Sequence, residues 1–282
     1  MIIVTNDYGC GTSSSIIDYN LQNYCIVSEE NWEHVFDLDD DVLLVGHDFL
    51  FYMWDTQEKV ERWKKFQHAK ILWCFERVDA IFAEWLAKSH FSIKMASQFV
   101  DSIYACDEDD CNKYGFKWLP QWASNKFYEK RGINPTKGNT ILFSGQAGKI
   151  EYKPRTALLQ QIFHDKDIKD LFYISNITRE LTWDQYIDNF LSYKIILNPV
   201  GTLKALNTRA YEALYSGRIL LQHTAGEYKR HEEMLSETPH VLFFKNYDEL
   251  KQKIKQIDLC KINADLAFKD NNLVERLQRI KI

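Results

Sequence analysis

The chain has 282 residues, of which 45% are hydrophobic and 27% charged, and its formal net charge is −5. This composition excludes a disordered chain, and the length is enough for two compact domains with substantial cores. The acidic balance argues against a protein whose main affinity is for nucleic-acid phosphates, so DNA is a permitted but not a favoured partner.

Six cysteines are scattered along the chain without a C-x-x-C pair or a matching histidine spacing, so they predict no zinc site. They are typical of small buried residues in a reducing compartment. No basic and apolar leader follows Met1, and no apolar segment approaches the roughly 18 residues of a spanning helix. We therefore expect a cytoplasmic protein with no membrane span.

The first half of the chain alternates short apolar runs with helical segments. Strands are expected at 2–5, 24–28, 41–45, 70–75, 101–105 and 116–120, and helices at 14–23, 56–69, 80–88 and 91–99. Apolar runs that alternate with helices predict a parallel sheet covered by helices.

Two loops of this half hold candidate functional residues, because each follows a strand at the carboxyl edge of the expected sheet. Gly9, Gly11 and Thr12 lie in the first loop, where backbone and hydroxyl groups can approach an anion; a plain tight turn fits this spacing about as well. The second loop holds His47 and Asp48, a candidate base and its orienting carboxylate. The alternative is an ordinary loop histidine and a helix cap.

An acidic run at 107–110 contains a D-x-D triplet of the kind that binds hard cations. Acidic residues also favour the first turn of a helix, where Asp107 can accept hydrogen bonds from free backbone N–H groups. We favour the helix cap, and no metal site is predicted.

The polar segment 129–138 is expected to link an amino-terminal domain, residues 1–132, to a carboxyl-terminal domain, residues 139–282. In the second domain, strands are expected at 140–143, 171–175 and 195–197 and from 219, and helices at 152–163, 183–193 and 207–217 and from 228, 248 and 263. The last helix is expected to pack back across the domains. The fold class is therefore α/β, with two Rossmann-like domains.

The segment 195–221 reads as strand, loop, helix and strand, which places its loop and helix start at the carboxyl edge of a parallel sheet. Asn207 is expected to cap this helix, and Gly217 to end it in a left-handed conformation. Arg209 in the first turn opposes the helix dipole, and a bound anion would relieve that conflict. The alternative is that Arg209 and Glu212 form a solvated i, i+3 pair of little energetic weight.

A similar arrangement begins the second domain. The apolar run 140–143 is followed by Gly145 and Lys149, and Arg155 lies at the start of the next helix. The same anion-binding argument applies to this loop and helix start. Lys149 is a phosphate partner by charge alone and is equally well explained as a solvated side chain.

The string NTRAYEALYSG, residues 207–217, resembles the donor-site helix of GT-B glycosyltransferases, most closely the CgeB-like, spore-maturation group. The resemblance implies two Rossmann-like domains that face each other across a cleft. It places Glu212 on the ribose of a nucleotide sugar and Arg209 near the diphosphate. Asn207, which begins the same helix, is a further candidate for donor binding. Many retaining members have an acidic residue eight positions before this glutamate, where the present chain has Lys204.

Other positions are implied by the same resemblance. An F-x-G pattern with a following arginine carries the donor-binding role to Gly145 and Arg155, and the edge loop around Ile177 corresponds to the nucleobase site. The glycine-rich loop that holds Gly9, Gly11 and Thr12 corresponds to the amino-terminal loop that faces the donor.

The resemblance therefore implies a hexosyl- or pentosyltransferase that uses a nucleotide sugar, UDP- or GDP-linked. Two arginines can stabilise the departing diphosphate without a metal, so no metal or other cofactor is expected. The resemblance also implies retention of configuration and a carbohydrate, glycan, protein or modified-nucleobase acceptor. His47, Asp48 and Arg209 are the candidate catalytic residues. Two alternatives stay open: a nucleotide-binding module without turnover, for which Lys204 argues, and a phage-type DNA base glycosyltransferase.

Overall fold

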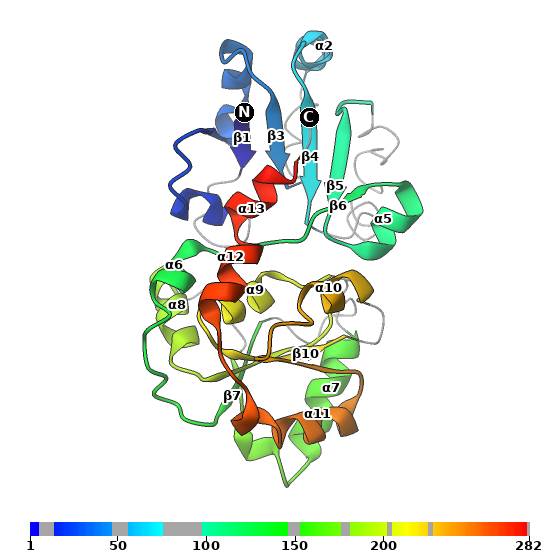
Figure 1. The fold of residues 1–282 in the computed structure, drawn as a ribbon. Coiled ribbons are helices and arrows are strands. Elements are labelled where there is room, and N and C mark those ends of the chain that lie inside the picture. Colours follow the sequence, from blue (N-terminus) through cyan, green and yellow to red (C-terminus); the bar gives the residue numbers. More distant parts are fainter. Residues whose placement is uncertain are drawn as a thin grey trace. The chain divides into compact units, whose positions relative to one another are not determined.

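A computed structural model describes residues 1–5, 14–46, 56–75, 98–145, 153–175, 181–201, 205–224 and 228–280. The chain forms two compact units, Met1–Gln121 with Arg276–Ile282 and Trp122–Glu275 (Figure 1). Each unit has its own parallel sheet flanked by helices, so the structure has two Rossmann-like units. Among the described helices, none combines the length and the apolar character that crossing a bilayer requires.

The first unit is built on a six-stranded parallel sheet with the order β2-β1-β3-β4-β5-β6. Its strands are β1 (Ile2–Thr5), β2 (Cys25–Ser28), β3 (Val42–Val45), β4 (Lys70–Cys74), β5 (Ser102–Ala105) and β6 (Lys117–Trp118). Its described helices are η1 (Ser14–Asp18), η2 (Glu29–Asp37), α2 (Gln57–Lys65) and α5 (Glu108–Tyr114), of which η1 and η2 are 3-10 helices.

All strands predicted in this half are present. The expected helix 14–23 is shorter, because only the 3-10 turn η1 forms, and the 3-10 helix η2 was not predicted. The helices expected at 80–88 and 91–99 fall almost wholly outside the described residues.

One face of this sheet carries a described core of the first unit, and residues of the other face, such as Leu43 and Trp73, are buried as well. Alternate strand residues pack on the first of these faces against η2 and α2, as the two-residue period of a strand requires. Trp63 on α2 is fully buried and donates its indole N–H to the backbone oxygen of Phe99 at 2.7 Å. The Asp107 carboxylate accepts hydrogen bonds from the backbone N–H groups of Asp109 and Asp110 at 2.9 and 3.1 Å. The predicted cap of α5 is therefore confirmed.

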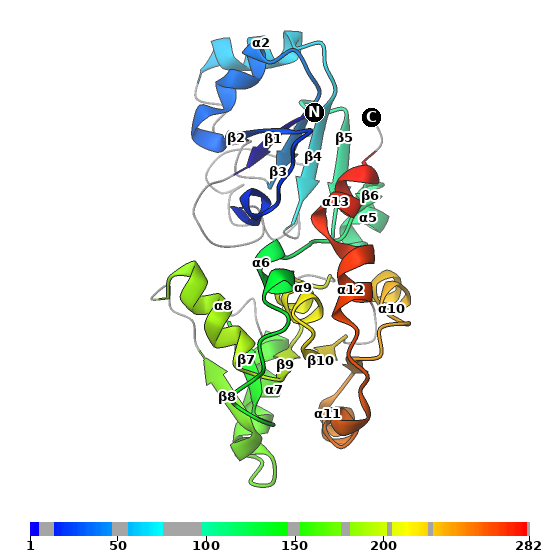
Figure 2. The ribbon, with the colours of Figure 1, turned by 60° about the vertical axis from the view of Figure 1, so that its left-hand side comes forward.

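The second unit is built on a five-stranded parallel sheet with the order β11-β10-β9-β7-β8, of which Figure 2 labels β7 to β10. Its strands are β7 (Ile141–Ser144), β8 (Phe172–Ser175), β9 (Ile195–Asn198), β10 (Ile219–His223) and β11 (Val241–Phe244). Its α-helices are α6 (Asn125–Glu129), α7 (Lys153–His164), α8 (Trp183–Leu191), α9 (Thr208–Tyr215), α10 (Lys229–Met234), α11 (Tyr247–Ile254) and α12 (Ala264–Asn271). Two 3-10 helices, η4 (Lys169–Leu171) and η5 (Ile257–Leu259), complete it, and α13 (Leu273–Gln278) spans the division at Arg276.

The two faces of this second sheet are covered by different helices. Leu142, Ile196 and Leu220 share a core with α8 and α9, whereas the residues that alternate with them share a core with α7 and α11. In both sheets, the second strand along the chain pairs with one edge of the first strand, and the third strand pairs with the opposite edge of the first strand. The strand order therefore reverses between β1 and β3 and between β7 and β9. At such a switch point, loops leave the carboxyl edge in opposite directions and leave a crevice for a ligand.

The division between the units falls between Gln121 and Trp122, before the polar segment 129–138 that was expected to be the linker. The reason is that Phe127 on α6 is fully buried in the core of the second unit. The polar segment also belongs to that unit, since the backbone N–H groups of Thr136 and Lys137 donate to the oxygen of Ser192 at 3.0 and 2.9 Å.

Candidate functional site

A row of polar residues ends three neighbouring strands of the second sheet. Ser144, Asn198 and Gln222 follow Leu142, Ile196 and Leu220 with the two-residue period of a strand, on the face that α8 and α9 cover. All three are buried, and in the described chain the Ser144 hydroxyl has no hydrogen-bond partner. The row lies at the carboxyl edge on both sides of the switch point between β7 and β9.

Arg209 lies at this edge, in the first turn of α9. Its Nη1 donates to Asn198 Oδ1 at 3.1 Å, and its guanidinium carbon lies 5.3 Å from the centre of the Phe143 ring. The guanidinium occupies the place that a Cβ at residue 145 would take, and Gly145 has a φ of +151°, which favours glycine. Within the described residues, Arg209 Nε has no hydrogen-bond acceptor.

A second guanidinium reaches the same ring from the other side of the sheet. Arg155 on α7 is 5% exposed, and its guanidinium carbon lies 5.9 Å from the centre of the Phe143 ring. A Cβ at residue 201 would meet this guanidinium, so Gly201 leaves room for it. Because α7 and α9 cover opposite faces, the sheet edge brings together Arg155 and Arg209, which we call the arginine pair.

Glu212 lies one turn after Arg209 on α9 and is only 4% exposed. The Tyr186 hydroxyl on α8 donates to its Oε2 at 2.5 Å, and its Oε1 accepts no hydrogen bond from the described residues. Burial raises the pKa of Glu212 to about 7, although the Tyr186 hydrogen bond and the charge of Arg209 both act to lower it. Burial, together with the charge of Glu212, raises the pKa of Tyr186 well above its usual value.

This geometry decides between the two explanations of the pair on α9. Arg209 and Glu212 form no ion pair in the described chain, and Glu212 is buried rather than solvated. The solvated i, i+3 pair is therefore excluded.

The predicted cap of α9 is wrong and the predicted end is correct. Asn207 occupies the N-cap position, but its side chain makes no capping hydrogen bond, and its buried Oδ1 has no partner in the described chain. Gly217 has a φ of +64°, and its N–H donates to Leu214 O while the next N–H donates to Ala213 O, at 3.2 and 2.8 Å. These two bonds form the Schellman end that a glycine at this place predicts.

The structure thus brings Gly145, Arg155 and Arg209 together at one sheet edge, with Asn207 and Glu212 on the same helix start as Arg209. The other predicted site residues fall outside the described residues; they are Gly9, Gly11, Thr12, His47, Asp48, Lys149, Ile177 and Lys204.

Phe143, Tyr186 and Gln222 were not predicted as site residues, whereas Asn198 was expected only as the start of a loop, 198–202, that positions sugar and acceptor. A signal for Gln222 exists in the sequence, because the apolar runs before 198 and 222 are both followed by a polar residue on the same strand face. The pairing of Tyr186 with Glu212 has no such signal, because Tyr186 fits equally well into the aromatic face that α8 presents to its core.

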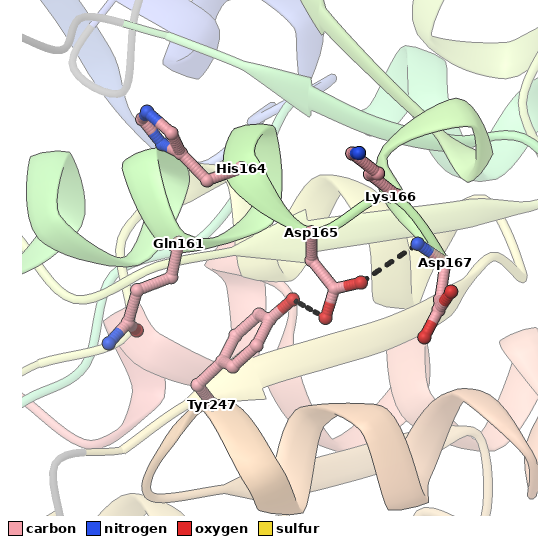
Figure 3. A pocket seen from close by; sticks show the side chains of 6 residues that line it. All are labelled: Gln161, His164, Asp165, Lys166, Asp167 and Tyr247. Carbon is pink, nitrogen blue, oxygen red and sulfur yellow. Dashed lines mark hydrogen bonds between the residues drawn. The ribbon is translucent and has the colours of Figure 1, made fainter.

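A separate surface hollow of about 500 Å³ lies near the end of α7 (Figure 3). Its centre is Asp165, which accepts the Tyr247 hydroxyl at 2.7 Å and the backbone N–H of Asp167 at 2.8 Å. The Tyr247 hydrogen bond is the main cause that lowers the pKa of Asp165. Its remaining lining residues are Gln161, His164 and Lys166. The central carboxylate is already engaged, so this hollow offers a ligand less than the arginine pair does.

The arginine pair can bind negative charge, and the buried carboxylate of Glu212 lies near it at the switch point. This arrangement suits a ligand that carries phosphates and hydroxyls. No protein-family model matches the chain, and no curated protein matches it. Function is therefore inferred from the arginine pair and its surroundings, together with the resemblance of residues 207–217.

Proposed function

We propose that the protein is a glycosyltransferase of the GT-B type that moves a sugar from a nucleoside-diphosphate sugar to an acceptor hydroxyl or amine. The observation that carries the proposal is the convergence of Arg155 and Arg209 over the Phe143 ring. Two guanidinium groups match the geometry and charge of a diphosphate, and they lie at the sheet edge where doubly wound folds bind such ligands.

Each residue has a defined task in this proposal. The bond from the sugar C1 to the diphosphate oxygen breaks and a bond from C1 to the acceptor forms. Negative charge develops on the departing diphosphate, which takes up the proton that the acceptor loses. Arg155 and Arg209 stabilise that charge as it develops, without a metal. Glu212 binds a ribose hydroxyl through Oε1, while Tyr186 holds Oε2. UDP- and GDP-sugars are the proposed donors, with retention of configuration.

The first test is binding. We expect UDP or GDP to raise the melting temperature of the protein, because a ligand specific to the folded state stabilises it. Arg209→Ala should weaken nucleotide affinity by at least tenfold in isothermal titration calorimetry. Arg131→Ala is the matched control, since it removes the same charge from a separate cluster with Tyr128 and Asp265. Equal affinities of the two variants would contradict the proposal.

The second test is turnover. Wild-type protein should hydrolyse or transfer sugar from one member of a panel of UDP-, GDP- and ADP-sugars, and Glu212→Ala should reduce kcat/KM. Nucleotide binding without turnover over the whole panel, with acceptors included, would instead identify a binding module of the same fold.

A further inference from the structure

A buried arginine is usually neutralised by a carboxylate, because an unpaired buried charge is costly. Arg209, which is half-buried and has a buried Nε, departs from this rule within the described chain. Its one hydrogen-bond acceptor there is the neutral side-chain amide of Asn198, and Glu212 on the next turn is engaged by Tyr186. Within the described residues, the site therefore orients this guanidinium through a neutral amide rather than through a carboxylate.

The orientation of the Asn198 amide is fixed by a second amide. Gln222 Nε2 donates to two backbone oxygens, those of Asn198 at 3.3 Å and His223 at 2.8 Å. This leaves Gln222 Oε1 as an acceptor for Asn198 Nδ2 at 2.7 Å. Asn198 must then present its Oδ1 to the guanidinium, because its two side-chain atoms have opposite hydrogen-bonding roles. Backbone carbonyls of β9 and β10 thus determine where Arg209 points.

Both amides are almost fully buried, Asn198 at 2% and Gln222 at 1% exposed. At these strand positions an apolar residue would extend the core made by Ile196 and Leu220. A buried polar pair with every polar atom engaged is rigid and specifies one arrangement. Asn198 and Gln222 therefore place polar side chains at two buried positions where packing alone would favour apolar side chains.

We propose that Asn198 and Gln222 form an amide ladder that positions Arg209 against a phosphate of the ligand and leaves its full positive charge for that ligand. This inference rests on the proposed function and deepens it, since it selects ligands that carry a diphosphate over neutral nucleosides. Both amides are positioning residues, which act through Arg209.

The direct test is Asn198→Asp, which keeps the shape of the side chain and puts a carboxylate beside Arg209 Nη1. The new carboxylate competes with the ligand phosphate for the guanidinium. We expect UDP affinity, measured by calorimetry at pH 8 and low salt, to fall at least thirtyfold. The dependence of affinity on salt should also become weaker, because one cationic charge is neutralised. A mere packing defect would leave that salt dependence unchanged.

Two further variants separate charge from orientation. Gln222→Met removes the support of the ladder but adds no charge, so we expect a loss of roughly fivefold with the salt dependence of the wild type. Asn189→Asp makes the same chemical change on α8 and should alter UDP affinity less than twofold. If Asn198→Asp does not fold, Gln222→Met still tests the ladder.

The outcomes distinguish the inference from the function on which it rests. If the wild type binds UDP and either folded ladder variant binds it within twofold as tightly, the positioning role of the amide ladder is overturned. The glycosyltransferase proposal would still stand. Absence of wild-type binding to UDP, GDP, ADP and inorganic pyrophosphate would overturn both.

Discussion

At the scale of single residues, Glu212 links the site to pH. Its pKa is about 7 in the folded protein, against an ordinary value of 4.5, because burial disfavours the carboxylate. The folded state therefore holds a proton that the unfolded state releases between these two values. The stability that this proton contributes is fully present below pH 4.5 and is lost as the pH rises through 7.

Glu212→Gln makes the side chain permanently neutral, so the variant should not lose this stability as the pH rises. We expect the free energy of unfolding of the variant, relative to that of the wild type, to rise by about 2 kcal/mol between pH 5 and pH 8. Urea unfolding at both pH values measures the difference. Stability curves that run parallel for the two proteins would contradict the assignment of the titration to Glu212.

Tyr186 acts on the same group from α8. Its hydrogen bond lowers the pKa of Glu212, so Tyr186→Phe should raise that pKa further. If the ribose binds the carboxylate form, UDP affinity rises with pH, and the midpoint of this rise should move upward in the variant. Calorimetry between pH 6 and pH 9 measures the midpoint. Tyr193→Phe, which removes the hydroxyl of a different tyrosine of this unit, should leave it unchanged.

At the scale of elements, the close approach of β7 and α9 depends on Gly145. A Cβ at this residue would meet the Arg209 guanidinium, and the φ of +151° strains any other residue. Gly145→Ala should therefore lower UDP affinity at least tenfold. Gly138→Ala is the matched control, because Gly138 also has a positive φ but no atom within 4 Å of an added Cβ. It should cost about 1 kcal/mol of stability, seen in urea unfolding, and no affinity.

Elements whose apolar pattern is strong were predicted well, and those that depend on local detail were not. The buried strands β3, β7, β9 and β10 could be read directly, because each contains a continuous run of at least three apolar residues. The strand β11 was missed although Pro239 lies just before it, since a run of only four apolar residues does not by itself define an element. The helix η2 was missed because it is a 3-10 helix with a kink at Asn31.

Some residues of the candidate site could likewise be predicted from the sequence, and others could not. Arg155, Arg209 and Gly145 were predictable because glycines and charges at a helix start have a known meaning beside a strand end. The roles of Phe143 and Gln222 depend on which atoms meet across neighbouring strands. That information comes from the register of β7, β9 and β10, which the spacing along one strand does not contain.

At the scale of the whole molecule, each unit has its own sheet and its own core, and the arginine pair lies within Trp122–Glu275 alone. Damage to the first core should therefore weaken the first unit without changing nucleotide affinity. Trp63→Ala removes a fully buried indole of that core and should cost about 3–5 kcal/mol of local stability.

Hydrogen exchange measured with and without UDP tests this independence. In Trp63→Ala the strands β1, β3 and β4 should exchange faster, while UDP should still protect β7, β9 and α9, because bound ligand stabilises the unit that holds it. UDP affinity should stay within twofold of the wild type. Leu214→Ala, in the core beneath α9, should instead weaken both protection and affinity. Loss of UDP affinity in Trp63→Ala would show that UDP binding requires the first unit, since no residue of the arginine pair or the amide ladder would have been changed.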